Sequence, residues 1–253
     1  MTQTESQIFN RVERLVGLEG LEVLQNLKVI VFGVGGVGGW CAESLVRSGV
    51  KHLTIVDSDR VSITNVNRQA MATTLTVGQV KVEALKQRLL AINPDARIDA
   101  REGIYSADTA DLYPLSDYDY VIDAIDSLQD KVTLILRATA ANCKFYSSMG
   151  AALKMDPTKI SVAEFYKVQG CPLARALRRR MKSLERYPAR KFKCVYSPEV
   201  LQNKGADTLP PPSATASYAD SRKAQINGTL AHTTAIFGFT LAGLVVQDAL
   251  GTH

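Results

Sequence analysis

A glycine-rich turn follows a short apolar run near the start of the chain. Residues 29 to 40 read VIVFGVGGVGGW, so a buried strand leads directly into a segment with almost no side chains. Such a turn lets the backbone approach a phosphate, and the helix that follows offers free N–H groups and the positive end of its dipole to the anion. The glycines of this cradle are Gly33, Gly35, Gly36 and Gly38. By itself the turn fits a nicotinamide dinucleotide and ATP equally well.

A carboxylate stands where such a site holds the ribose. Asp57 ends the run HLTIVD, 24 residues after Gly33. In dinucleotide-binding folds an acid about 20 residues beyond the glycine turn accepts hydrogen bonds from the ribose hydroxyls. Asp57 would serve either nucleotide, so it also leaves the choice open.

The polar residues farther along the chain favour a triphosphate with Mg²⁺. A dehydrogenase needs an uncharged slot for its nicotinamide. This chain instead surrounds the turn with two cations and several carboxylates, a combination suited to phosphates and a divalent ion. The candidates are Asp59, Asn65, Arg68, Gln69, Lys81, Asp123 and Asp126. We therefore expect ATP and Mg²⁺ at this site.

Alternating elements would place these residues along one edge of a sheet. Apolar runs predict strands, and the spacing of Val82, Leu85, Leu89 and Ile92 is typical of an amphipathic helix. The alternation predicts an α/β fold, a Rossmann-like and mostly parallel sheet with helices on both faces and additional strands in the C-terminal half. We expect strands at 27–33, 52–57, 96–101, 118–122, 144–149, 159–164 and 192–197, and helices at 36–48, 80–92, after 130, from 173 and after 230.

Composition sets the broad class of the protein. With 253 residues and 46% hydrophobic content, the chain can bury a sizeable core. The polar N-terminus lacks the apolar core of a signal peptide, and the apolar stretch 233–246 is shorter than the ~20 residues of a membrane span. We therefore expect a cytoplasmic protein without a span. The four cysteines stand singly, without a C-x-x-C pair, so we expect neither disulfides nor zinc.

Several motifs together resemble the superfamily of ubiquitin-activating enzymes and sulfur-carrier adenylyltransferases, which transfer AMP to a carboxylate. The resemblance is carried by NRVERLVGLEGLEVLQNLKVIVFGVGGVGGW, TIVDSDRVSITNVNRQ, VGQVKVEAL and VIDAIDS. It implies a single ThiF/MoeB-like ATP-binding domain over 1–253, with a nucleotide-binding core at 1–150. A substrate-facing and dimerisation half would follow at 151–253, with a flexible loop at about 198–224.

The same resemblance assigns roles to the candidate residues. It implies that the four glycines cradle the phosphates, that Asp57 holds the ribose with Asp59 in the same nucleotide site, and that Asp126 binds Mg²⁺. The contacts to the phosphate chain would come from Asn65, Arg68, Gln69 and Lys81.

An arginine near the N-terminus matches a further feature of the superfamily. Arg11 falls on the arginine finger, which in homodimeric members reaches the ATP of the neighbouring subunit, and Arg14 is the alternative position. The resemblance therefore implies a homodimer. The implied catalytic residues are Arg11, Arg68, Lys81 and Asp126.

The second half of the chain resembles the tRNA threonylcarbamoyladenosine dehydratases. The matching stretches are SSMGAALKMDPTKISVAEFYKVQGCPLARALRRRMK, KCVYSPE and INGTLAHTTAIFGFTLAGLVVQDAL. The resemblance implies that the carboxylate of threonylcarbamoyladenosine, beside the tRNA anticodon, is activated by ATP as an acyl-adenylate. The carbamoyl group then closes the ring with net loss of water. Two stretches depart from the family: Cys171 stands where an acid is common, and the loop after Pro198 is this chain's own.

Positive charge is concentrated in one segment of this half. The net charge is +5, yet residues 173–193 carry nine Lys or Arg against one acid, a local charge of +8 that leaves −3 for the remainder. A charge run is often only a solvated helix face, but the near absence of acids favours contact with RNA phosphates. The RNA-binding candidates are Arg175, Arg178, Arg179, Arg180 and Lys182.

Two other functions stay open at this point. An adenylyltransferase for the C-terminal carboxylate of a small ubiquitin-like or sulfur-carrier protein would use the same chemistry, although such enzymes usually hold zinc through C-x-x-C pairs. A Rossmann module or oxidoreductase that binds NAD would not need Arg68 and Lys81. The general base is open between Asp126 and the substrate itself, and so is a sulfur-transfer or redox partner.

Overall fold

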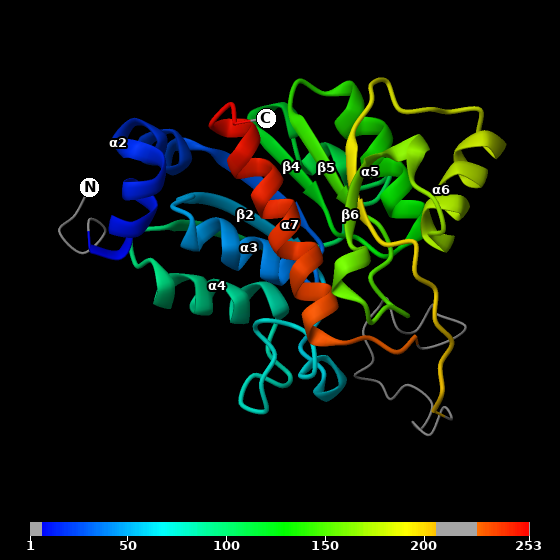
Figure 1. The fold of residues 1–253 in the computed structure, drawn as a ribbon, viewed down its shortest axis with the longest axis horizontal. Helices are drawn as coiled ribbons and strands as arrows, with labels where there is room; N and C mark the ends of the chain where they lie inside the picture. The colour runs from blue at the N-terminus through cyan, green and yellow to red at the C-terminus, as the bar shows by residue number, and fades with distance from the viewer. Residues whose placement is uncertain (1–6, 206–226, 253) are drawn as a thin grey trace.

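One seven-stranded sheet forms the centre of the protein (Figure 1). The computed structural model describes residues 7–205 and 227–252. The strands are β1 (Lys28–Phe32), β2 (His52–Asp57), β3 (Arg97–Glu102), β4 (Tyr120–Asp123), β5 (Lys144–Ser148), β6 (Ser161–Glu164) and β7 (Lys193–Tyr196). Their order is β3-β2-β1-β4-β5-β7-β6, and every neighbouring pair is parallel except β6 with β7. The central strand β1 reads KVIVF and is buried after its first residue, as expected for a parallel strand covered on both faces.

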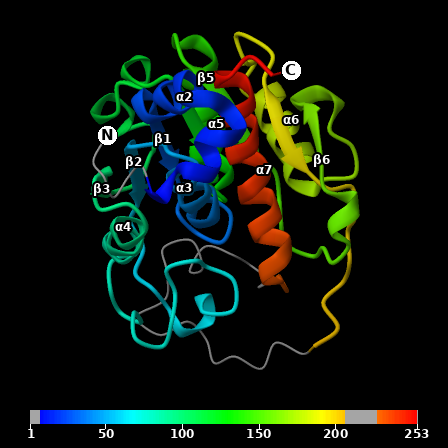
Figure 2. The ribbon, with the colours of Figure 1, turned by 60° about the vertical axis from the view of Figure 1, so that its left-hand side comes forward.

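Helices cover both faces of this sheet (Figures 1 and 2). Within the described residues, the helices of four residues or more are α2 (Asn10–Asn26), α3 (Gly38–Arg47), α4 (Lys81–Ile92), α5 (Leu128–Ala140), α6 (Pro172–Ser183) and α7 (Ala231–Ala249). α3, α4 and α7 pack on one face, where Leu45 and Phe237 are buried, and α5 and α6 pack on the other, where Leu134 and Leu177 are buried. Two apolar cores therefore sandwich the sheet.

The predicted α/β class is confirmed, and the expected strands and helices are present with ends shifted by a few residues. The helix expected from residue 36 begins at Gly38, because residues 35–37 still belong to the turn. The strand expected from residue 159 begins at Ser161, because Pro157–Lys159 forms a 3-10 helix (η4). Residues 198–205 are irregular, and the rest of the loop expected at 198–224 lies outside the described residues.

The most apolar helix of the sequence is a core helix. α7 packs along α3, and its side chains Phe237, Leu241 and Val245 are completely buried. Across residues 7–205 and 227–252, no helix has both the length and the apolar character needed to cross a membrane.

Candidate functional site

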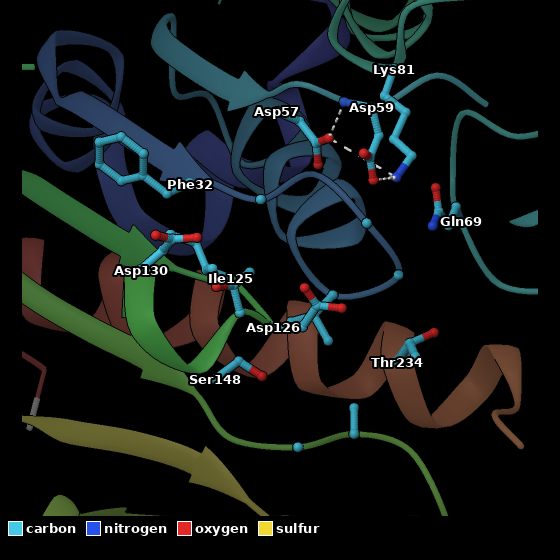
Figure 3. Close-up of a pocket in the computed structure, with 18 of the residues that line it drawn as sticks. Phe32, Asp57, Asp59, Gln69, Lys81, Ile125, Asp126, Asp130, Ser148 and Thr234 are labelled. Atoms are coloured by element: carbon cyan, nitrogen blue, oxygen red, sulfur yellow. Dashed lines mark hydrogen bonds and ion pairs between the residues drawn. The ribbon is translucent and has the colours of Figure 1, made fainter. Parts of the chain in front are cut away.

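A cavity of about 580 Å³ lies at the carboxyl ends of the strands (Figure 3). It lies where β1 is flanked by β2 on one side and β4 on the other, which is the point where open α/β sheets bind their ligands. The volume falls within the range of cofactor pockets, roughly 300–1,000 Å³. The predicted residues that line this cavity are Gly33, Gly35, Gly36, Asp57, Asp59, Asn65, Arg68, Gln69, Lys81 and Asp126.

The glycine turn is shaped by contacts that a side chain would block. Gly33 has a φ of +81°, and a Cβ there would lie 2.8 Å from the carbonyl oxygen of Ala124. At Gly38 a Cβ would lie 1.8 Å from the carbonyl oxygen of Gly33. At Gly35 a Cβ would have no neighbour closer than 3.7 Å. Gly33 and Gly38 are therefore required by the turn itself, whereas Gly35 leaves space for a ligand.

We expect Gly38→Ala to lower the free energy of unfolding by about 3 kcal/mol, the upper part of the range for overpacking, because the turn must open to admit the methyl group. Urea unfolding followed by circular dichroism measures this change. The matched control is Gly243→Ala in α7, where a Cβ would meet nothing within 4 Å. Helix propensity should make that variant as stable as the wild type or up to about 1 kcal/mol more stable. Wild-type stability of Gly38→Ala would contradict the close packing of the turn.

Asp57 is anchored at the end of β2 by two backbone donors. Its Oδ2 accepts a hydrogen bond from the N–H of Val34 at 2.8 Å, and its Oδ1 accepts one from the N–H of Asp59 at 2.9 Å. Burial raises the pKa of this carboxyl, and the charge of Lys81 offsets part of the rise. A carboxylate has about four acceptor positions, so Asp57 keeps acceptor capacity for ligand hydroxyls while its orientation is fixed.

Lys81, the first residue of α4, is a buried cation held between acids. It is 4% exposed, and its Nζ lies 2.8 Å from Oδ2 of Asp59 and 4.0 Å from Oδ1 of Asp57. Burial by itself lowers the pKa of Lys81, but the charges of Asp57, Asp59 and Asp126 outweigh burial and raise it overall. The ammonium group is therefore charged at neutral pH and fixed in direction beside the cavity (Figure 3).

The segment after the 3-10 helix η1 (Ile63–Asn65) carries Arg68 to the cavity. The indole N–H of Trp40 donates to the carbonyl oxygen of Arg68 at 3.0 Å, and Nη1 of Arg68 donates to the carbonyl of Thr64 at 2.8 Å. Oδ1 of Asn65 accepts a hydrogen bond from the N–H of Ser62 at 3.0 Å. Asn65 therefore shapes this segment, and the indole of Trp40 fixes the backbone from which Arg68 projects.

Gln69 shows that the cavity suits a polar ligand. Its Oε1 is buried and has no hydrogen-bond partner among the described residues. Buried amides are nearly always paired, and this side chain can present either its oxygen or its NH₂ group to a ligand. Its Nε2 also lies nearest to the open space at Gly35. The unpaired side-chain oxygen of Gln69 and the open space at Gly35 together fit the phosphate chain of a nucleotide.

The loop after β4 is held by a buried ion pair. Lys131 and Asp123 are both 0% exposed, and Nζ of the lysine lies 2.8 Å from Oδ2 of the aspartate. Lys131 donates to the carbonyl of Ile125 at 3.0 Å, while Asp123 accepts from the N–H of Ile125 at 3.1 Å and from the Ser147 hydroxyl at 2.7 Å. The backbone N–H and the carbonyl group of Ile125 are therefore both fixed, next to Asp126 in the cavity wall.

The polar cavity residues that were not identified from the sequence include Asp130, Ser148 and Thr234 (Figure 3). Ser148 ends β5, so its place at the carboxyl edge of a predicted strand was a usable signal. Thr234 comes from the start of α7, and its hydroxyl lies 3.4 Å from the carbonyl oxygen of Arg68, 166 residues away. No spacing rule connects residues so far apart.

Arg11 and Arg14 lie outside this cavity. Both are exposed on α2, and Arg14 donates to Oδ1 of Asn10 at 3.0 Å. α2 lies near the C-terminal end of α7, where a Cβ at Gly20 would lie 3.2 Å from Leu250. The segment that carries Arg68 lies at the opposite end of α7 (Figures 1 and 2).

The basic residues of α6 divide into two groups. An open hollow beside the helix is lined by Leu128, Pro172, Arg175, Ala176, Arg179, Arg180 and Ser183. Lys182 is exposed outside that lining. Arg178 instead packs over the Phe165 ring at 5.8 Å and donates to the carbonyls of Phe165 and Val168, both at 3.2 Å. Its guanidinium thus ties α6 to the preceding loop.

The fold and the cavity define a nucleotide-binding protein of the Rossmann-like α/β class. The chain belongs to the ThiF family, whose sequence model matches residues 9–252. It is 33% identical over 220 residues to the tRNA threonylcarbamoyladenosine dehydratase of Haemophilus influenzae, covering 83% of this chain and 81% of that protein. It is 36% identical over 174 residues to the enzyme of the same name from Bacillus subtilis, covering 69% and 68%.

Solved structures agree with the sequence relatives. Escherichia coli tRNA N6-threonylcarbamoyladenosine dehydratase in complex with AMP matches with a TM-score of 0.86 and 31% identity, covering 99% of this chain and 96% of that one. The same protein in complex with ATP matches with a TM-score of 0.85. The resemblance inferred from the motifs is therefore confirmed.

Proposed function

We propose that this protein is an ATP-dependent tRNA threonylcarbamoyladenosine dehydratase that acts in the cytoplasm. The carboxylate of the threonylcarbamoyl group, on an adenosine next to the anticodon, attacks the α-phosphorus of ATP, and pyrophosphate leaves. The carbamoyl group then attacks the activated carbonyl carbon, AMP leaves, and one proton is released. The nucleoside loses one water overall and becomes cyclic.

The observation that carries this proposal is that the nucleotide cavity adjoins the hollow beside α6. Leu128 lines both the nucleotide cavity and the hollow that contains Arg175, Arg179 and Arg180. An RNA whose backbone phosphates bind those arginines would therefore have a modified base within reach of the cavity. The names of the sequence relatives and of the solved structures support the same reaction.

The residues of the cavity suit a reaction in which charge develops on phosphates. Lys81 and Arg68 would hold the phosphate chain and stabilise the negative charge of the leaving pyrophosphate. Ring closure is intramolecular, so the enzyme contributes mainly by orienting the substrate and needs no protein nucleophile. This agrees with the four cysteines, which are free thiols, three of them buried.

Asp126 would contribute one carboxylate ligand to Mg²⁺. Within the described residues no group of three or more His, Cys, Asp or Glu side chains could hold a metal by itself. Magnesium in nucleotide sites typically uses one or two carboxylates together with substrate phosphates, and a single Asp fits that pattern. The ion would supply charge neutralisation to the phosphates when bound.

Removing two arginines of the hollow should weaken RNA binding selectively. We expect Arg175→Ala with Arg179→Ala to raise the Kd for tRNA about tenfold, and to reduce the slope of log Kd against log salt by about 2, because two phosphate contacts are lost. Fluorescence anisotropy across a salt series measures both. The control removes equal charge elsewhere, through Lys86→Ala on α4, which packs on the other face of the sheet, with Arg97→Ala on the edge strand β3. Identical losses in both double variants would contradict a specific RNA surface on α6.

We further propose that Arg11 acts in trans in a homodimer, as its distance from its own cavity suggests. Arg11→Ala should bind ATP within about threefold of wild type yet turn over at least tenfold more slowly, because an arginine finger acts on transition-state charge. Mixing it with Asp126→Ala subunits should restore about a quarter of wild-type activity, since half of the dimers are mixed and each has one complete site. A mixture as inactive as its parents would exclude the trans arrangement.

The proposed function is tested by incubating purified protein with ATP, Mg²⁺ and tRNA that carries threonylcarbamoyladenosine. Mass spectrometry of the nucleosides should show an ATP-dependent loss of one water, which a chelator abolishes. No mass change, despite ATP binding, would reject the proposal. The acceptor would then be sought among small proteins with a C-terminal Gly-Gly, by pyrophosphate exchange.

A further inference from the structure

Asp130 is a largely buried residue whose carboxylate has no partner among the described residues. It is the third residue of α5, is 7% exposed, and lines the nucleotide cavity. Within residues 7–205 and 227–252 its side chain takes part in no hydrogen bond or ion pair, and it is open to the cavity that it lines. The neighbouring Lys131 is already engaged by Asp123 and by the carbonyl of Ile125. A carboxylate that faces the cavity without a protein donor is free to accept a hydrogen bond from a ligand bound there.

The position of Asp130 within the cavity identifies the part of the ligand that it faces. In Figure 3, Lys81 and Gln69 lie on one side, Asp57 lies between, and Asp130 lies on the other side beside Ile125. A nucleotide with its phosphates on Lys81 and its ribose on Asp57 would extend its base toward Asp130. Phe32 and Ile125 lie at this end of the cavity (Figure 3), and the ring of Tyr105, another lining residue, packs against Phe32 at 4.7 Å, which suits a flat aromatic base.

We propose that Asp130 selects adenine, because its carboxylate accepts a hydrogen bond from the exocyclic 6-amino group of the base. An ionised carboxylate only accepts hydrogen bonds. Guanine and hypoxanthine carry a carbonyl oxygen at position 6, so two acceptors would face each other in a buried site. The proposal rests on the use of ATP in the proposed function, but it can be tested without any RNA.

A matched control in this chain tests whether Asp130 has only a structural role in its helix. Acids in the first turn of a helix are stabilised by the helix dipole wherever they lie. Glu83 is also the third residue of its helix, α4, but it is exposed and does not line the cavity. Glu83→Ala therefore removes a first-turn acid without touching the base site.

The experiment is calorimetric titration of the purified full chain with ATP, with inosine triphosphate, and with purine riboside triphosphate, which lacks the 6-amino group. The wild type should bind ATP about tenfold or more tightly than either analogue, as expected for a hydrogen bond to a charged group. Asp130→Ala should bring ATP and purine riboside triphosphate to the same affinity. Asp130→Asn, whose amide both donates and accepts, should reduce the preference for ATP over inosine triphosphate about tenfold. Glu83→Ala should keep the wild-type ratios.

Two results would overturn the inference. If Asp130→Ala weakens ATP and purine riboside triphosphate by the same factor, the carboxylate acts on the fold or the cavity and not on the base. If the variant leaves every affinity unchanged, Asp130 does not contact the nucleotide. Thermal unfolding without nucleotide checks that each variant is folded. If the protein prefers ATP over the two analogues but does not convert threonylcarbamoyladenosine in tRNA, the proposed function is refuted and the role of Asp130 in base selection still holds.

Discussion

Replacing Lys81 by methionine should lower kcat/KM for ATP by about a hundred- to a thousandfold, the usual cost of removing a preorganised group that stabilises transition-state charge. The side chain is 4% exposed and its charge is the counterion of Asp57 and Asp59. Without it, these carboxylates and Asp126 would repel the triphosphate. Release of pyrophosphate in the presence of modified tRNA measures the loss, and calorimetry measures ATP binding separately.

A control on the same helix separates this effect from a general change of charge. Lys86 is partly exposed on α4 and does not line the cavity. Lys86→Met should therefore keep kcat/KM within about twofold of wild type, because an exposed surface charge contributes little. If Lys81→Met retained a third or more of wild-type activity, Lys81 would have no role in holding the phosphates.

Replacing Lys131 by methionine should lower the free energy of unfolding by about 3–5 kcal/mol, because it leaves the carboxylate of Asp123 buried and without its counterion. Both groups are 0% exposed. The carbonyl of Ile125 loses its donor as well, so the loop that carries Asp126 would no longer be fixed. Urea unfolding measures the loss of stability.

The double variant Lys131→Met with Asp123→Asn tests the reason for that loss. A neutral amide at position 123 removes the uncompensated charge and can still accept the hydrogen bond from Ser147. We expect it to recover more than half of the lost stability, since a buried pair costs much less when both charges are removed together. Activity should stay low in both variants, because Ile125 remains without its donor. A double variant as unstable as the single one would mean that methionine disturbs packing and that the ion pair contributes little.

Much of the site was predictable because its chemistry is local in the sequence. A turn that must approach phosphate without a Cβ requires glycine at particular positions, and a parallel strand covered on both faces must be continuously apolar. Gly33, Gly38 and the run KVIVF satisfy both needs within a dozen residues. The carboxyl ends of parallel strands meet at one edge of a sheet, so Asp57 and Asp126 could also be assigned to one site from their positions after predicted strands.

The rest depends on packing between distant segments, which local patterns do not encode. The run of cations on α6 is uniform in sequence, yet only the packed helix decides that Arg178 lies over Phe165 while Arg175 and Arg179 line an open hollow. Asp130 follows Asp126 by four residues and reads as one more acid before a helix.

The sequence by itself therefore determined the class of fold, the nucleotide cradle and most of the charged residues that line the cavity, because those features follow from chain geometry over short distances. The tertiary structure alone decided which charges are buried, which are paired and which face the cavity. Burial and pairing are set by side chains from other elements, as with Lys131 from α5, which fixes the loop after β4, and Thr234 from α7, which lies against Arg68.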